Sequence, residues 1–342
     1  MSRRILPSPG APLAVLSMML AAVVSAGGQA PAAKKNGAAP KKAASTWAAP
    51  RTAWGDPDLQ GTWNNGTITP LERARGAGEK DLLSKEEEAE VNAQSDTRAE
   101  RRPADRAQDV ELAYDQFWWD RGASIGRTSL IIDPKDGRLP PLTPEGQKLI
   151  DARASARRAR GPADSWVDRP LQERCILYHG VPPLPTGYNN NYQIAQTPGL
   201  VAILHEEIHE VRLIHLDGRP HSSASIRQWL GDPRGHWEGD TLVVETTNFR
   251  EDATFRFPAD AATLRVVERF RRVGPDAIDY QFTVDNPTLY ARPWTATLPM
   301  RTSDGLIYEY ACHEGNYSLP NVLGGFRAQE KAAAEAAKKD KK

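Results

Sequence analysis

Residues 189–249 decide the fold. They read NNNYQIAQTPGLVAILHEEIHEVRLIHLDGRPH over 189–221 and IRQWLGDPRGHWEGDTLVVETTNF over 226–249, and they hold five of the seven histidines. Successive side chains of a β-strand point to opposite faces, so alternate residues share a face. We therefore expect one strand face to carry a row of histidines and a glutamate among apolar residues: Val201, Ile203, His205, Glu207, His209, Val211, Leu213 and His215.

Two turns and a further strand follow. Asp217-Gly218 is a hairpin signal, because both central positions of a tight hairpin turn need a positive φ. Residues 237–241 form a second turn signal. They lead into the β-branched run 242–247, which is too short for a helix and predicts another strand.

The same stretch permits a second interpretation. His205-Glu206-Glu207-Ile208-His209 matches H-E-x-x-H and resembles the zinc motif of the zincin metalloproteases. That motif needs a helix, on which two histidines one turn apart bind zinc and the first glutamate acts as general base. On a strand, H-x-E-x-H can also chelate a metal from one face. The candidate metal ligands are His205, Glu207 and His209, and the candidate cofactor is Zn²⁺ or another divalent metal ion.

The C-terminal half alternates short apolar runs with turn residues. We expect strands over 264–273, 278–284, 294–300 and 306–313, because clusters of Gly, Pro, Asn and Asp separate these runs. Strands at this spacing favour an antiparallel barrel or a sandwich. The predicted fold class is therefore mainly β: an antiparallel lipocalin-like barrel or sandwich with a few peripheral helices and long loops.

A short signature supports the barrel. Gly61-Thr62-Trp63 resembles the G-x-W signature of the calycins, which are lipocalin-like barrels. The resemblance implies a ligand-holding barrel whose floor is closed by Trp63.

The region between this signature and the central stretch is irregular. Ser84 with glutamates after it predicts a capped helix over 84–102, and Thr143-Pro144 predicts a helix over 143–160. Trp118 belongs to an aromatic cluster of the kind that forms a core or a pocket wall. Residues 161–188 form a proline-rich loop that we expect to cover the barrel mouth, because so long a loop in a compact domain is usually functional.

The two ends of the chain differ from the middle. Residues 1–26 combine Arg3 and Arg4, an apolar run and small residues, which is typical of a secretory signal peptide cleaved after Ala26. Residues 27–50 predict a disordered linker. Residues 51–326 then form a single domain, and residues 327–342 a charged helical tail. We expect a periplasmic or extracellular protein with no membrane span in the mature chain.

Composition narrows the partners. Lys and Arg number 44, as do Asp and Glu, so the chain lacks the basic footprint of a nucleic-acid-binding protein. Cys175 and Cys312 are the two cysteines. An even pair in an oxidising compartment predicts a disulfide between them, with two buried free thiols as the alternative.

Several longer segments, among them WGDPDLQGTW, HWEGDTLVVETTNF and YEYACHEGNY, are similar to an exported bacterial family. The similarity spans roughly residues 54–326. It implies export, but it brings no activity and no catalytic residues.

Three functions remain open, and enzyme status stays undecided. The chain is an acid–base lyase, isomerase or hydrolase for a small organic molecule, a non-catalytic ligand-binding protein, or a metal-dependent hydrolase through residues 205–209. A buried histidine–carboxylate pair can exchange protons near neutral pH. The candidate catalytic residues are Glu207, His209, His313 and Glu314. The candidate ligand-binding residues are Trp118, Tyr192, Arg212, Asn248, Tyr308 and Tyr310.

Overall fold

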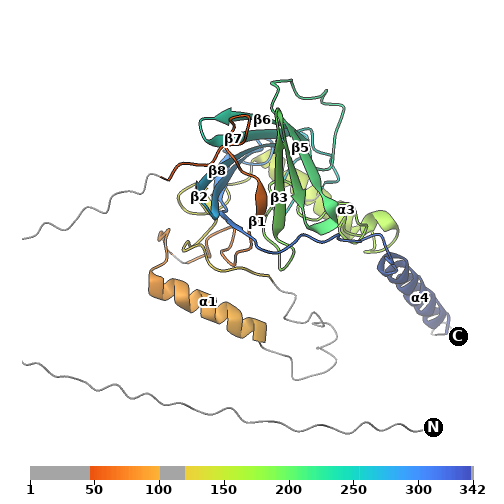
Figure 1. Ribbon diagram of the computed structural model, residues 1–342. Helices are drawn as coiled ribbons and strands as arrows, with labels where there is room; N and C mark the ends of the chain where they lie inside the picture. The colour runs from red at the N-terminus through yellow and green to blue at the C-terminus, as the bar shows by residue number, and fades with distance from the viewer. Residues whose placement is uncertain (1–46, 77, 101–119, 254, 340–342) are drawn as a thin grey trace, which may run out of the picture. The chain divides into compact units, whose positions relative to one another are not determined.

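The computed structural model describes residues 47–76, 78–100, 120–253 and 255–339. Within them, nine strands close a β-barrel (Figure 1). In order around the wall these are β11 (Met300–Thr302), β1 (Gly61–Asn64), β3 (Asn191–Thr197), β4 (Leu200–His205), β5 (Val211–His215), β6 (Asp232–Glu238), β7 (Thr241–Thr247), β8 (Arg265–Gly274) and β9 (Ala277–Asp285). β10 (Trp294–Thr297) and β2 (Ile131–Asp133) continue the sheet from β9.

The barrel closes through its shortest strand. β11 pairs with β1 through Trp63 and Thr302, and with β9 through Met300 and Ile278. The mainly β barrel that the sequence predicts is therefore confirmed.

One pairing is not antiparallel. In the described part of the chain, β5 and β6 run parallel and meet at a single pair, His215 with Arg234. The hairpin predicted at Asp217-Gly218 is wrong, because residues 216–231 form a long connection before β6 begins. The turn over 237–241 is confirmed, since Glu238 pairs with Thr241 in the β6–β7 hairpin.

Alternating side chains fill the interior. β9 buries Ile278, Tyr280, Phe282 and Val284 on one face, as a half-buried strand with period two should. Trp63 is fully buried, and its indole N–H donates to the carbonyl of Leu59 at 2.9 Å. This arrangement agrees with a calycin-like barrel at the level of architecture.

The row of residues expected on one strand face is divided. β4 ends at His205 and β5 begins at Val211, with the short 3-10 turn η3 (Glu207–His209) between them. Ile208 has a φ of 59°, which no α-helix allows, so the helical H-E-x-x-H interpretation is wrong as well. The turn also changes which positions face inward. The inward residues of β4 have odd numbers, whereas β5 buries Arg212 and Ile214 and leaves Val211 and Leu213 facing outward.

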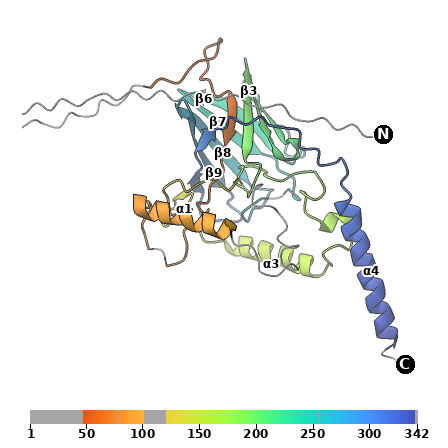
Figure 2. The ribbon, with the colours of Figure 1, turned by 60° about the horizontal axis from the view of Figure 1, so that its bottom comes forward.

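The predicted helices form, with shifted ends. α1 (Lys85–Glu100) begins after Ser84, whose hydroxyl accepts from the backbone N–H of Glu87 at 3.2 Å. α3 (Pro144–Arg158) has Thr143 as its N-cap. α4 (Ser318–Lys339) starts before the predicted tail, and residues 306–313 form no strand, because they have no strand partner among the described residues. In Figure 2, β6, β7, β8 and β9 follow one another around the wall.

The disulfide between Cys175 and Cys312 is confirmed, and it ties the loop over 161–188 to the segment before α4. No described helix is long and apolar enough to cross a membrane. The predicted signal peptide over 1–26, most of the predicted linker and Trp118 lie outside the described residues.

Candidate functional site

The proline-rich loop over 161–188 contributes to the barrel interior. Its residues from His179 to Leu184 are all buried, which a loop passing over the surface would not achieve. A short 3-10 turn, η2 (Trp166–Asp168), lies at its start. The loop therefore delivers His179 to the side chains that enter the barrel from β3 and β4.

Three buried side chains converge there. His179, His205 and Glu210 are 1%, 0% and 4% exposed. One nitrogen or oxygen from each lies within 4.8 Å of the other two. His205 closes β4, and its backbone N–H donates to the carbonyl of Glu210 at 2.8 Å, so the η3 turn sets the spacing of these two residues.

Glu210 is held as a carboxylate. It accepts hydrogen bonds from the backbone N–H groups of Tyr178, His179 at 3.1 Å and Gly180 at 3.4 Å. Its other contact is Nδ1 of His205 at 3.2 Å. Burial by itself raises the pKa of Glu210, but the hydrogen bonds from His205 and Tyr178 outweigh it and keep this pKa below its usual value. The anionic form is thus favoured.

The two imidazoles keep free nitrogens. Nε2 of His205 and both ring nitrogens of His179 are buried and have no hydrogen-bond partner among the described residues. Burial, followed by the charge of His205, lowers the pKa of His179 to about 3, so this ring is neutral near pH 7. Buried polar atoms are normally paired, so these three unpaired nitrogens indicate a ligand, an ion or ordered water.

Aromatic rings border the cluster. The ring of Tyr192 lies edge-on to that of His205, with centroids 4.7 Å apart. The Tyr192 hydroxyl is buried, and burial raises the pKa of Tyr192 well above its usual range, so it remains protonated. A protonated tyrosine therefore packs against the imidazoles of the cluster.

Glu207 is a second buried carboxyl beside the cluster. It is fully buried, and its Oε1 accepts from the amide of Gln172 at 3.3 Å. Burial raises the pKa of Glu207 to about 8, against opposing hydrogen bonds from Tyr310 and Gln172. Its Oε2 has no partner among the described residues. Although Glu207 was a predicted metal ligand, it does not belong to the group of three.

The other predicted site residues lie elsewhere. Arg212 points inward and forms a buried ion pair with Glu268, while Asn248 donates to the carbonyl of Ser222 at 2.9 Å. Tyr308, His313 and Glu314 are exposed on the segment before α4 and do not join the buried cluster. The backbone of His209 lies in η3, and its side chain, like Trp118, is outside the described set.

Sequence reasoning missed His179 and Glu210. His179 lies in a loop with no period, and only the unusual length of that loop marked it. Glu210 lies at an odd position relative to His205, which a continuous strand would place on the opposite face.

Comparison of this chain with known proteins finds no relative. No protein-family model, curated protein or solved structure matches this chain. The resemblance to an exported bacterial family therefore stays a prediction.

Proposed function

We propose that this protein binds a divalent transition-metal ion through His179, His205 and Glu210, and that it is an exported metal-dependent enzyme acting on a small organic molecule. The observation that carries the proposal is the convergence of three buried donor groups within 4.8 Å. Two imidazoles and one carboxylate are a recurring set for catalytic Zn²⁺ and for non-haem Fe²⁺.

The three donor atoms would need to move only slightly closer together to hold such an ion. Zn–N distances are about 2.0–2.1 Å, which brings neighbouring ligand atoms to about 3–4 Å from each other. Because neither ring nitrogen of His179 has a hydrogen-bond partner in the described part of the chain, its ring can turn toward the ion without losing one. The backbone N–H groups that hold Glu210 would fix the carboxylate as outer partners usually do.

The surrounding residues suggest the reaction class. A bound ion would polarise a carbonyl group or lower the pKa of a water molecule. Tyr192 offers a hydroxyl on one side, and Glu207 offers a second carboxyl group able to exchange a proton. Hydrolysis or elimination on a small carbonyl compound fits these groups. The disulfide and the signal-like residues 1–26 support an exported location.

Metal analysis tests the proposal. The protein, purified without chelator or affinity metal, is stripped, incubated with Zn²⁺ or with Fe²⁺ under anaerobic conditions, and analysed by mass spectrometry for bound metal. We expect about one ion per chain. His179→Gln and His205→Gln should both lose it, whereas His236→Gln, which removes an exposed histidine of β6, should retain it. Equal binding by all four proteins, or no binding by any, would refute the metal centre.

A second function is favoured by one contact. Nδ1 of His205 lies 3.2 Å from Oε2 of Glu210, which leaves Nε2 free to accept a proton from a ligand. Metal-free acid–base catalysis by this pair is therefore the alternative. It predicts no metal binding, and a bell-shaped pH–rate profile that His205→Gln abolishes while His179→Gln only weakens it.

A further inference from the structure

The wall of the barrel is open between β5 and β6. These strands pair only at His215 and Arg234, and the chain before β6 does not follow β5 toward Val211. Instead Gln228 is held away by the backbone of the segment after β7: its N–H donates to the carbonyl of Asn248 at 2.9 Å. The result is a cleft of about 690 Å³, which is the size of a small-molecule site.

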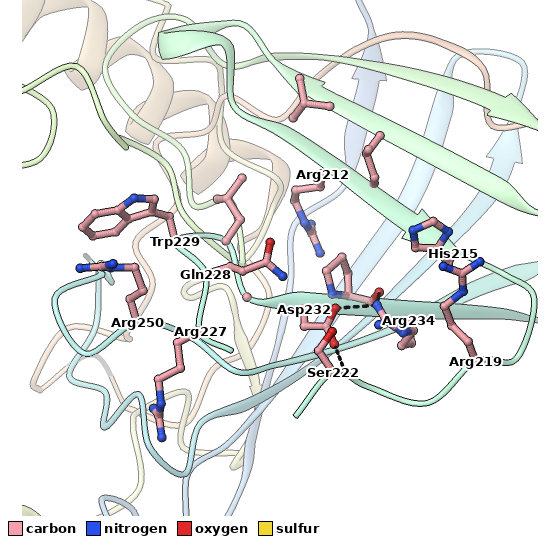
Figure 3. A pocket seen from close by; sticks show the side chains of 15 residues that line it. Arg212, His215, Arg219, Ser222, Arg227, Gln228, Trp229, Asp232, Arg234 and Arg250 are labelled. Atoms are coloured by element: carbon pink, nitrogen blue, oxygen red, sulfur yellow. Dashed lines mark hydrogen bonds and ion pairs between the residues drawn. The ribbon is translucent and has the colours of Figure 1, made fainter. Parts of the chain in front are cut away.

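Positive side chains outnumber negative ones in the lining of the cleft. Among the described residues, five arginines and one carboxylate, that of Asp232, line it. Figure 3 shows Arg212 reaching from β5 toward Gln228, and His215 and Arg219 lying close together farther along the cleft. The arginines are Arg212, Arg219, Arg227, Arg234 and Arg250.

The counter-ions of these arginines mostly lie outside the cleft. Arg219 pairs with Asp217 and Arg250 with Asp252, and neither aspartate lines the cleft. A guanidinium carries five N–H donors, and a bidentate carboxylate occupies two of them, so donors remain for a ligand. Arg227 donates to the carbonyl oxygens of Phe249 and Ala261 and forms no ion pair with a described carboxylate.

Arg212, which lines the cleft, has a buried N–H group without a hydrogen-bond partner among the described residues. Arg212 is 2% exposed, and its Nε has no partner among the described residues, although its terminal nitrogens bind Glu268. A buried N–H without an acceptor costs stability, so an acceptor from a ligand would repair a defect in the free protein.

Apolar side chains line the rest of the cleft. Val211 and Leu213 are 47% and 51% exposed, and Trp229 and Leu230 also line the cleft. A ligand for this cleft therefore needs an acceptor-rich anionic end and an apolar body. Inorganic anions such as phosphate satisfy only the first requirement.

We propose that the cleft between β5 and β6 binds an organic carboxylate with an apolar body. The carboxylate meets the arginine donors, and the body covers Val211, Leu213 and Trp229. This site does not depend on the metal centre, because none of its lining residues belongs to the cluster of His179, His205 and Glu210.

Calorimetry on the full protein tests the proposal. The probes are hexanoate, phenylacetate and indole-3-acetate, each compared with the alcohol of the same carbon skeleton, and inorganic phosphate. We expect at least one carboxylate to bind about tenfold or more tightly than its alcohol, and the affinity to fall with added salt. Equal affinity within every pair, or no binding by any carboxylate, overturns the proposal. Tighter binding of phosphate than of all carboxylates overturns the carboxylate assignment.

Two pairs of variants locate the site. Leu213→Asp places a negative charge on an exposed position of the cleft, and it should weaken carboxylate binding about tenfold or more. Val273→Asp, at an exposed position of β8 outside the cleft, should change it by less than about twofold. Arg219→Gln should weaken binding, and Arg271→Gln, which removes an exposed arginine of β8, should not. Equal effects of the cleft variants and their controls would place the ligand elsewhere.

Discussion

Glu207 shows how one buried side chain makes stability depend on pH. Its pKa rises from 4.5 to about 8 on folding, so the folded state holds a proton that the unfolded chain releases. A raised folded pKa adds stability that is fully present below the unfolded value and is lost as the pH rises through the folded value.

We therefore predict that, with metal chelated, the free energy of unfolding falls between about pH 5 and about pH 8, by up to about 1.4 kcal/mol per pH unit from this residue. Urea denaturation at several pH values measures it. Glu207→Gln should flatten the profile in this range, and Glu314→Gln, at an exposed position, should leave it unchanged. An identical slope in the Glu207→Gln protein would contradict the assignment.

The buried ion pair of Arg212 and Glu268 gives a second residue-level prediction. Both side chains are fully buried, and Glu268 also accepts from the hydroxyl of Tyr280 at 2.9 Å. Arg212→Met should lower the free energy of unfolding by about 3–5 kcal/mol, because it leaves a buried carboxylate without its cation.

Adding Glu268→Gln to Arg212→Met should recover part of that loss, since a neutral amide oxygen can still accept from Tyr280. Chemical denaturation of the two single variants and the double variant measures the coupling. Strictly additive losses would show that the two charges do not stabilise each other.

At the level of elements, the turns explain where the sequence was sufficient. Residues 237–241 form the turn of the β6–β7 hairpin, and the β-branched run of β7 follows it at once, so the local signal and the fold agree. Asp217-Gly218 also consists of residue types that favour a tight turn, but the next strand starts only at Asp232, so no hairpin forms there. The short η3 turn could not be predicted from the sequence, because His205, Glu207 and His209 continue the period of two through it.

The disulfide links two segments that belong to no strand of the sheet. The segment over 303–317 has no regular structure, and its ties to the loop over 161–188 include the Cys175–Cys312 bond and a hydrogen bond from Asn316 to the carbonyl of Glu173 at 3.0 Å. We predict that replacing both cysteines by serine lowers the free energy of unfolding by about 2–5 kcal/mol.

Hydrogen exchange of the same double variant should accelerate over 303–317 and leave β8 and β9 protected. Wild-type protein treated with reductant is the matched control and should show the same local change. Unchanged exchange over 303–317 would mean that other contacts hold this segment.

At the level of the whole molecule, strand alternation predicts the wall but not its closure. The periods of β8 and β9 are visible in the sequence, as are the turns between them. Closure depends on β11, a strand of three residues that pairs with both β1 and β9. The candidate site has the same origin: His179 and His205 come together only because a long loop enters the barrel, and no local pattern encodes that path.

Trp63 tests whether the barrel unfolds as one unit. It joins three parts of the chain: it lies on β1, its indole N–H donates to Leu59, and the guanidinium of Arg272 from β8 lies 5.3 Å from its ring centroid. Trp63→Ala should lower the free energy of unfolding by about 3–5 kcal/mol, because it empties a fully buried aromatic site.

Trp54→Ala, which removes a tryptophan that is 38% exposed, should change that free energy by about 0.5 kcal/mol or less. If the wall is a single cooperative ring, near-ultraviolet and far-ultraviolet circular dichroism of the Trp63→Ala protein will lose signal at the same, lower denaturant concentration. Separate transitions would show instead that the wall does not unfold as one unit, and that closure contributes little to its stability.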